Sequence, residues 1–314
     1  MVLSNDLSQF HGLPVVNFPA EDQPPVSMPE TLVAWRVSVP TYDSDPTWSE
    51  EFERFLSVVD PSAVTALVVG GWNDPYDVSS AAIVESLVAA APKLTALRAL
   101  FIGDMTFEDC EISWIVQSDL TALLTAYPNL NELGIRGGTS LELQPVRHAG
   151  LNRLLIESGG LPAAVVRAVA ASDFPNLTDL ELWLGTEDYG GDASIDDVAP
   201  ILQGDRLPAL KRLALRNSDI ETEIASAVAV AAITARIVHL DLSMGVLLDE
   251  GAEALLAGQS LDHLESIDLT HNYLTDSVRQ RIVDRFVGKV QADAGDADAD
   301  EYDGTVYRSV AVGE

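Results

Sequence analysis

The stretch Leu264-Glu-Ser-Ile267-Asp-Leu269-Thr-His-Asn272-Tyr-Leu274 decides the fold of this 314-residue chain. Ile267 and Leu269 lie two positions apart, the spacing of side chains on the buried face of a strand. Asn272 and Leu274 then follow at a turn. The pattern returns upstream, so the sequence predicts a stack of similar units rather than a single globule. Copies begin at Val64, Leu97, Leu130, Leu151, Leu177, Leu210, Ile237 and Leu264, and a degenerate copy begins at Leu32.

Segments with helical spacing separate these copies. Pro92 ends the first such segment, and Pro162 stands where a first helical position tolerates a residue without an N–H. One strand and one helix per repeat predict parallel strands on a concave face and helices on the convex side. We therefore predict an α/β solenoid with about eight or nine parallel strands. Helices are predicted over residues 79–90, 119–126, 162–171, 221–232, 249–258 and 276–286.

Two runs carry a family resemblance. The run from Leu247 to Leu255, Leu-Leu-Asp-Glu-Gly-Ala-Glu-Ala-Leu, and the strand pattern at Leu264 resemble leucine-rich repeat proteins of the ribonuclease-inhibitor-like subtype. The resemblance covers roughly residues 60–290 and implies a horseshoe solenoid. Asn occupies the turn position only at Asn272, so other turns must satisfy their backbone groups differently. Three further runs, Phe10 to Val15, Gly103 to Met105 and Cys110 to Trp114, look similar to an uncharacterised bacterial branch of these proteins.

The ends of the chain differ in composition from the middle. Residues 1–30 contain five prolines, which suits an irregular segment that covers the first strand of the stack. Residues 291–304 are rich in Asp and Ala and are predicted to be disordered. We divide the chain into an N-terminal cap with one degenerate repeat (1–60), leucine-rich repeats (61–290), a disordered acidic linker (291–304) and a short terminal strand (305–314).

Composition limits the partners and the compartment. The net charge of −31 repels phosphate backbones and anionic lipid headgroups, which excludes nucleic acid and membrane partners and favours a basic protein. The lone Cys110 cannot form an internal disulfide and fits a reducing compartment. The chain begins without a secretory signal pattern, and no apolar stretch approaches the roughly 18 residues that span a bilayer. We therefore expect a cytoplasmic protein.

The side chains that flank the buried leucines are expected on the concave face. In the first repeats these side chains are small and apolar, with Phe101 and the nearby Trp72 as the bulky members. An exposed apolar patch of this kind commonly marks a binding surface. In the alternative interpretation, the Pro-rich N-terminal segment folds over this apolar patch. The residues leave both interpretations open.

In the middle repeats the concave-face side chains alternate in charge. Glu132, Arg153, Asp179 and Arg212 share one position of the repeat, and Arg136 stands beside Glu157 in another. Such a ladder can pair with itself as a solvated face, each exposed pair contributing about 0–1 kcal/mol. It could also recognise a partner through Trp183, Arg136 and Arg216, because Trp and Arg are enriched at interface hot spots.

Acidic groups gather near the C-terminal end. Asp241 and Asp268 are predicted to be direct neighbours, flanked by His239 and by His271, which leaves from the turn. Such a cluster could hold a divalent metal or form a hydrated acidic edge. The loops 104–111 and 187–192 are also acidic, and we expect solvated loops first and cation or partner sites second. No phosphate-binding, zinc-protease or nucleophile-elbow motif occurs, and Cys110 has no base nearby in sequence.

These observations favour a non-enzymatic protein-interaction scaffold without a cofactor, which binds a protein or peptide on its concave face. The alternative is a metal-dependent hydrolase, or an accessory subunit of an enzyme, that uses the acidic loops and the Asp241/Asp268 cluster. A third hypothesis is an inhibitor whose acidic side chains imitate nucleic acid. The residues predicted to bind the partner are Trp72, Phe101, Arg136, Glu157, Trp183 and Arg216, of which Phe101, Trp183, Arg136 and Arg216 are predicted to lie exposed on the concave face.

Overall fold

The computed structural model describes residues 5–21, 31–43, 45–294, 297 and 299–313. The chain forms two compact units. The N-terminal unit comprises the described part of residues 3–143 together with His148–Glu157, and the C-terminal unit comprises Gln144–Arg147 together with Ser158–Gly313. In both units mostly parallel strands alternate with helices, which confirms the predicted α/β class and is consistent with a leucine-rich repeat solenoid.

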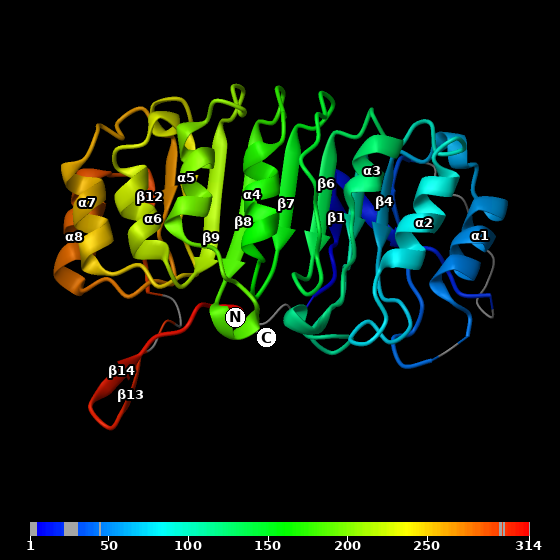
Figure 1. Cartoon of the computed structure of the whole chain (residues 1–314), viewed down its shortest axis with the longest axis horizontal. Helices are drawn as coiled ribbons and strands as arrows, with labels where there is room; N and C mark the ends of the chain where they lie inside the picture. The colour runs from blue at the N-terminus through cyan, green and yellow to red at the C-terminus, as the bar shows by residue number, and fades with distance from the viewer. Residues whose placement is uncertain (1–4, 22–30, 44, 295–296, 298, 314) are drawn as a thin grey trace. The chain divides into compact units, whose positions relative to one another are not determined.

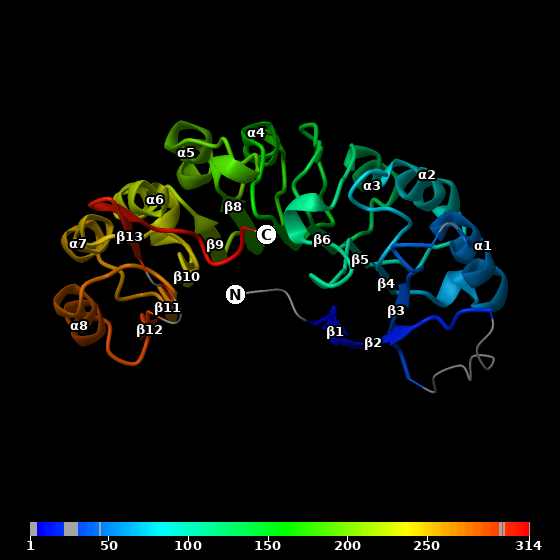
Figure 2. The same cartoon turned by 90° about the horizontal axis from the view of Figure 1, so that it is seen from below.

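In the N-terminal unit, strands β1 to β7 lie in chain order. β1 pairs with β2 in antiparallel fashion, and the later pairs up to β7 are parallel. Figure 2 shows α1 to α3 on the side of the sheet away from β1. The elements are β1 (Gln9–Phe10), β2 (Leu13–Asn17), β3 (Ala34–Val37), α1 (Trp48–Val58), η1 (Pro61–Ala63), β4 (Ala66–Val69), α2 (Ala81–Ala90), β5 (Ala99–Ile102), η2 (Ile112–Trp114), α3 (Thr121–Ala126), β6 (Glu132–Arg136) and β7 (Arg153–Glu157).

In the C-terminal unit, strands β8 to β12 are likewise parallel and in chain order, with α4 to α8 along one side (Figure 2). A separate antiparallel hairpin, β13–β14, follows. The elements are α4 (Ala163–Ala171), β8 (Asp179–Gly185), η3 (Glu187–Tyr189), α5 (Ile195–Gln203), β9 (Arg212–Ser218), α6 (Glu221–Val228), η4 (Ala232–Ala235), β10 (His239–Asp241), α7 (Asp249–Ala257), β11 (Ser266–Asp268), α8 (Asp276–Arg285), β12 (Val290–Gln291), β13 (Asp300–Tyr302) and β14 (Thr305–Tyr307).

The predicted strand register is confirmed within each unit. Ala34 pairs with Ala66, and Ala66 pairs with Ala99. In the C-terminal unit Arg212 stands between its predicted neighbours Asp179 and His239, and Asp241 stands beside Asp268. The repeat spacing in the sequence therefore fixes which side chains share a row across neighbouring strands.

All six predicted helices occur, within a few residues of the predicted bounds. Pro162 is the residue before α4 rather than its first helical residue, and the segment 221–232 ends its helix at Val228. Helices α1 and α5 were not predicted. Both start with a hydroxyl residue followed three positions later by an acid, Thr47 with Glu50 and Ser194 with Asp197. This capping-box pattern is the sequence signal that could have found them.

Apolar side chains fill the space between strands and helices. In the C-terminal unit Leu180, Leu213 and Leu240 occupy equivalent strand positions and are at most 1% exposed. In the N-terminal unit the degenerate repeat contributes Trp35 and Val37, whereas Leu32 is 63% exposed and precedes the strand. The inward assignment of Leu32 is therefore wrong. Aromatic rings pack on this side of the unit: Phe18, Trp35, Trp48, Phe52 and Phe55.

The turns satisfy their backbone groups in two ways. The amide oxygen of Asn272 accepts from the Leu247 N–H at 3.0 Å, and its nitrogen donates to the Leu242 carbonyl at 2.8 Å. Ser158 and Ser218 use a hydroxyl instead, which accepts from the N–H two residues later at 2.9 and 3.2 Å. At these two turns a short serine side chain thus bonds to the backbone, as the asparagine amide does at Asn272.

The C-terminal end departs from the predicted organisation. Gln291 and residues Asp300–Tyr302 lie in strands β12 and β13, where we predicted disorder, and residues 295, 296 and 298 of that segment fall outside the description. Strand β14 lies within the predicted terminal strand and pairs with β13. Across the part of the chain that the structure describes, no helix is both long and apolar enough to cross a bilayer.

Candidate interaction surface

The sheet of each unit has one face turned away from the helices. We name the face formed by β3 to β7 the N-terminal inner face, and the face formed by β8 to β11 the C-terminal inner face (Figure 2). The side chains predicted to point outward from the strands stand on these faces. The two faces belong to different units.

The N-terminal inner face is closed by the chain's own N-terminal segment. The ring of Phe10 packs edge-on against the ring of Phe101, with centroids 5.8 Å apart and planes at 82°. Ala34, Ala66 and Ala99 belong to the same buried cluster. Phe101 is consequently only 1% exposed. The N-terminal segment therefore covers the apolar patch, and the expectation that Phe101 is exposed is wrong.

Small residues leave room for this cover. The three alanines occupy equivalent positions on β3, β4 and β5, so no long side chain stands between Phe10 and the sheet. Gly134 lies next to Phe101 on β6, and a Cβ at Gly134 would stand 2.2 Å from Cδ2 of the Phe101 ring. The small residues thus leave space for the two aromatic side chains, Phe10 and Phe101, which pack edge to face.

Toward the ends of the strands, the N-terminal inner face carries a buried network of ion pairs and hydrogen bonds. Arg36 Nε donates to Asp104 at 2.9 Å, and Arg136 Nε donates to Glu157 at 2.7 Å. Arg136 also donates to the Met105 carbonyl at 2.7 Å. Asp104 was expected in a solvated loop, but it is 2% exposed, so that expectation is wrong.

The N-terminal segment joins the network through its backbone. The Leu7 N–H donates to Asp104 at 3.1 Å, and Arg36 donates to the Leu7 carbonyl at 2.7 Å. The exposed side-chain fractions of Arg36 and Arg136 are 8% and 3%. Because these groups bond to each other and to the segment, they are closed to a partner in this conformation.

The C-terminal inner face carries a ladder of arginines and carboxylates that is largely buried, with its arginines partly exposed. Arg212 donates to Glu181 at 2.7 Å, to Asp179 at 3.1 Å and to Asp241 at 3.0 Å. Arg216 donates to the other oxygen of Glu181 at 2.9 Å. The predicted self-pairing of the ladder is confirmed here. In the N-terminal unit it is also confirmed between Arg136 and Glu157 and between Arg153 and Glu132.

Electrostatics hold the ladder in its charged form. Burial alone raises the pKa of Glu181, but Arg212 and Arg216 outweigh it, so the pKa of this carboxyl lies below its ordinary value. Burial raises the pKa of Asp241, and Asp268 adds to the shift while Arg216 opposes it. Four carboxyls, those of Asp179, Glu181, Asp241 and Asp268, face two guanidiniums, so the ladder favours cationic partners.

Trp183 supports the ladder from within. Its indole Nε1 donates to Glu181 at 2.9 Å, and the Arg216 guanidinium carbon lies 5.4 Å from the ring centroid. Trp183 is 5% exposed, whereas the Arg212 and Arg216 side chains are 25% and 20% exposed. Trp183 therefore positions Glu181 and Arg216 rather than meeting solvent.

The predicted partner-binding residues thus divide by exposure. Arg216 retains partial exposure on the C-terminal inner face. Trp72 donates to the Val78 carbonyl at 2.8 Å and is 2% exposed. The expected exposure is wrong for Phe101, Arg136 and Trp183, and Trp72 and Glu157 are buried as well. Whether the six residues take part in binding stays a prediction.

The metal hypothesis rested on Asp241 and Asp268. These two residues are strand neighbours, as predicted, but each already accepts hydrogen bonds: Asp241 from Arg212 and Asp268 from the Thr270 N–H at 2.9 Å. His271 has a left-handed backbone with φ of 52° in the turn beyond β11. Among the residues that the structure describes, no group of three His, Cys, Asp or Glu side chains is arranged to hold a metal ion.

Cys110 is a buried thiol. Burial raises its pKa to about 12, and the neighbouring Glu111 and Asp109 add to the shift. A thiol with this pKa is almost wholly protonated at neutral pH, and the thiolate is the nucleophilic form. Cys110 is therefore unsuited to nucleophilic catalysis.

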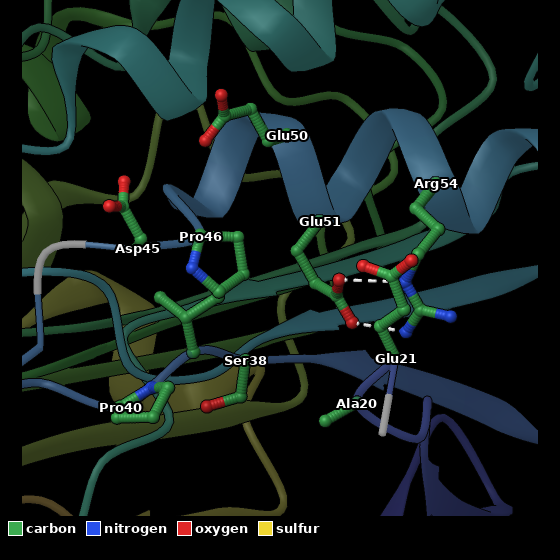
Figure 3. A pocket seen from close by; sticks show the side chains of 10 residues that line it. Ala20, Glu21, Ser38, Pro40, Asp45, Pro46, Glu50, Glu51 and Arg54 are labelled. Atoms are coloured by element: carbon green, nitrogen blue, oxygen red, sulfur yellow. Dashed lines mark hydrogen bonds and ion pairs between the residues drawn. The ribbon is translucent and has the colours of Figure 1, made fainter. Parts of the chain in front are cut away.

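A pocket of about 700 Å³ lies in the N-terminal unit between the start of α1 and the end of β3 (Figure 3). Glu51 and Arg54 line it and pair with each other, with Arg54 Nε donating to Glu51 at 2.8 Å. Sequence reasoning missed this pocket because it missed α1. The lining is Ala20, Glu21, Ser38, Val39, Pro40, Asp45, Pro46, Glu50, Glu51 and Arg54, an acidic set without a histidine, cysteine or lysine.

Comparison with known proteins places the fold. No family model matches the chain, and no curated protein matches it. The chain is similar to a protein of Bacteroides fragilis whose crystal structure was determined as a structural genomics target. The TM-score is 0.79, the sequence identity is 30%, and the match covers 90% of this chain and 78% of that chain. The chain therefore belongs to the same family as this Bacteroides fragilis protein.

Proposed function

We propose that this protein is a non-enzymatic interaction scaffold of the cytoplasm that binds a basic protein or peptide on its C-terminal inner face. We also propose that it is a leucine-rich repeat protein of the ribonuclease-inhibitor-like subtype. The observation that carries the proposal is the ladder of Arg212 and Arg216 with their carboxylate partners, which is ordered by Trp183 and still 20–25% exposed at the arginines.

The ladder is prepared for binding before any partner arrives. Each guanidinium is held by two or more hydrogen bonds, so ordering it on binding costs little further entropy. Arginine is also enriched among residues that dominate interface energies. The excess of carboxylates on this face, together with the net charge of −31, favours the approach of basic partners and discriminates against acidic ones.

The proposal places the partner on one face only. Phe101 and Arg136, predicted as anchors, are covered by the protein's own N-terminal segment. Asp179, Arg212 and His239 share one row of the C-terminal inner face, and the His239 side chain is 39% exposed. This row continues to the exposed Ser266, where a partner can be blocked without disturbing a buried contact.

Ser266 therefore offers the sharpest test. Ser266→Arg adds a positive charge to the face and should repel a basic partner, whereas Ser266→Glu should retain it. Val230→Arg is the matched control, because Val230 is 78% exposed at the end of α6 on the helix side. Each variant, immobilised at equal density, is used for affinity capture from the native cell, followed by binding measurements with the captured protein.

We expect affinity capture to yield a basic protein that binds the original chain, Ser266→Glu and Val230→Arg equally well. Ser266→Arg should weaken binding about tenfold, which corresponds to about 1.4 kcal/mol. Equal binding by all four proteins would contradict the assignment to this face. Capture of an acidic partner would contradict the electrostatic argument.

A further inference from the structure

The last described residues of the chain lie in an extended conformation across three successive turns of the C-terminal unit. Figure 1 shows this tail, in red, returning from the β13–β14 hairpin along one edge of the unit. The Tyr273 hydroxyl lies 2.8 Å from the Ser309 carbonyl oxygen, and the Ala311 N–H donates to the Met244 carbonyl at 2.9 Å. The tail therefore crosses the turns that follow β11 and β10.

Asn217, in the turn region of β9, holds the tail most closely. Its Nδ2 donates to the Val312 carbonyl at 2.6 Å, and its Oδ1 accepts from the Val312 N–H at 2.9 Å. The side-chain amide of Asn217 thus forms hydrogen bonds with both the N–H and the carbonyl of Val312. Asn217 is fully buried and also donates to the Ser158 carbonyl at 3.2 Å, so its orientation is fixed.

Side chains of the tail alternate between buried positions and positions that are at least partly exposed. Val310 and Val312 are 7% and 1% exposed, whereas Ser309 is exposed and Ala311 lies between these extremes. Proteins recognise extended peptides in this way: hydrogen bonds to the peptide main chain provide affinity, and sites for alternate side chains provide specificity.

The turns that form this groove share an unusual backbone. Asn217, Met244 and His271 stand at equivalent positions of successive repeats and have φ values of 52°, 70° and 52°. Left-handed conformations at bulky residues such as Met and His are uncommon and cost free energy, and they persist where the surroundings hold them. Here they repeat the same turn, and the Met244 carbonyl bonds to the tail.

We propose that this groove, formed by Asn217, Met244 and Tyr273, is a peptide-binding site that the chain's own tail, residues 309–313, occupies as a built-in competitor. The external ligand is an extended segment of a partner protein with β-branched apolar residues two positions apart. This inference concerns a different surface from the C-terminal inner face and does not depend on the proposed partner there.

Arg308 defines a further preference. Its guanidinium carbon lies 5.8 Å from the centroid of the Tyr273 ring, within the range of a cation–π contact. The pattern that fits the groove is therefore a basic residue followed by apolar β-branched residues two and four positions later. A basic ligand also suits a chain with a net charge of −31, which disfavours association between two copies of itself.

The β13–β14 hairpin, which precedes the tail, is weakly held. The tail can therefore leave the groove and an external peptide can take its place. Thr305, Val306 and Tyr307 of β14 are exposed, and β13 pairs only with β14 among the described strands. Isolated two-stranded hairpins are marginally stable in water. The contacts that retain the tail are therefore mainly those of residues 308–313 in the groove.

Two measurements on the full-length protein test the proposal. The first is the binding of a fluorescent synthetic peptide with the sequence of residues 307–313, followed by anisotropy. Val312→Asp should expel the protein's own tail, because Val312 is 1% exposed. This variant should bind the probe at least tenfold more tightly than the original chain, whose tail competes. A probe with Asp in place of both valines should not bind.

Tyr273→Phe in the Val312→Asp chain removes the hydroxyl that donates to the Ser309 carbonyl and accepts from the Ser309 N–H. It should weaken probe binding at least about fivefold, because one hydrogen bond contributes about 1 kcal/mol. Tyr76→Phe is the matched control, since Tyr76 lies in the N-terminal unit. Equal probe binding by the original and Val312→Asp chains, or no binding by either, would overturn the proposal.

The second measurement does not depend on the folding of Val312→Asp. A protease must extend the residues on both sides of the cleaved bond in its own site, so we expect trypsin to cleave after Arg308 mainly when residues 309–313 leave the groove, and mass spectrometry can follow the released peptide. Tyr273→Phe in the otherwise unchanged protein, and an excess of an unlabelled peptide of residues 309–313, which offers trypsin no cleavage site, should each accelerate this cleavage several-fold, whereas Tyr76→Phe should not. Unchanged cleavage in both cases would overturn the proposal. Concentration-dependent dimers that Val312→Asp abolishes would assign the groove to a second copy and overturn the partner assignment.

Discussion

The two inner faces use the same repeat positions in opposite ways. On the N-terminal inner face, Ala34, Ala66 and Ala99 leave space for Phe10, and the chain covers its own strands. On the C-terminal inner face, Asp179, Arg212 and His239 occupy the equivalent row and meet solvent in part. The repeat thus sets the position of each side chain, and its size and charge decide whether a face is closed or available.

The comparison also separates two kinds of ion pair. Arg36 and Asp104 are almost completely buried, whereas Arg212 and Asp179 are each about one quarter exposed. Water screens an exposed pair and leaves it little net effect on stability, whereas removal of one member of a buried pair leaves an uncompensated charge in a poorly solvated site. The Arg36–Asp104 pair therefore helps to hold the N-terminal inner face closed. The Arg212–Asp179 pair can exchange contact with water for contact with a partner.

The largest expected effect follows from this difference. Asp104→Ala should lower the free energy of unfolding by about 3–5 kcal/mol, because it leaves Arg36 without its buried carboxylate and removes one of the two carboxylates that face Arg136. Asp179→Ala, the matched change in the C-terminal unit, should lower it by about 0–1 kcal/mol. Denaturant unfolding of both variants measures the contrast. Equal losses would show that the two faces do not differ in the proposed way.

A somewhat smaller effect is expected from the apolar cover. Phe10→Ala should lower the free energy of unfolding by about 3 kcal/mol, the low end for truncation of a buried phenylalanine, because the N-terminal segment can detach locally. The matched control is Val306→Ala, in an exposed strand of the hairpin, which should change it by less than about 0.5 kcal/mol. A loss below about 1 kcal/mol for Phe10→Ala would contradict the closed N-terminal inner face.

The smallest expected effect concerns a buried acid next to the C-terminal ladder. Neither carboxyl oxygen of Glu221 reaches hydrogen-bond geometry with a described residue, although the backbone of Ser218 lies nearby. Burial raises the pKa of Glu221 well above its ordinary value, Asp241 adds to this shift, and Arg216 opposes it. The folded state therefore retains a proton that the unfolded chain loses near the ordinary pKa of Glu, about 4.3.

Stability must then fall as the pH rises from that ordinary value through the raised pKa of the folded state, since the unfolded chain binds fewer protons. Glu221→Gln removes this titration and should stabilise the protein by about 1–3 kcal/mol at about pH 8 but by less at about pH 5. Unfolding measured at both pH values provides the test. An equal effect of the substitution at the two pH values would refute the buried-acid interpretation.

Much of the fold could be predicted from the sequence because it depends on local spacing. The apolar residues of each repeat predicted the strand register that places Asp241 beside Asp268. Helix α1 escaped prediction although Thr47 and Glu50 carry a capping signal, because its segment precedes the clear repeats. Apolar periodicity predicted the strands of the regular repeats, but helix α5 was missed although it lies between two of them.

The candidate sites were harder to predict because their burial depends on distant contacts. Phe101 is buried by Phe10, and Arg36 by Asp104, which lies 68 residues away in sequence. Spacing within a repeat cannot reveal which segment folds over it. The same holds for the tail: Val310 and Val312 alternate as a strand would, but only the structure brings Asn217 to Val312.

The most direct test of the contrast between the two faces uses one reporter at the same repeat position. In a Cys110→Ala background, Ala99→Cys probes the closed face and Ser266→Cys the open one; Ala99 is fully buried and Ser266 is exposed. The account predicts that a thiol reagent modifies Ser266→Cys on the order of a hundredfold faster, and that adding Phe10→Ala accelerates modification of Ala99→Cys. Equal modification rates for Ala99→Cys and Ser266→Cys would contradict it.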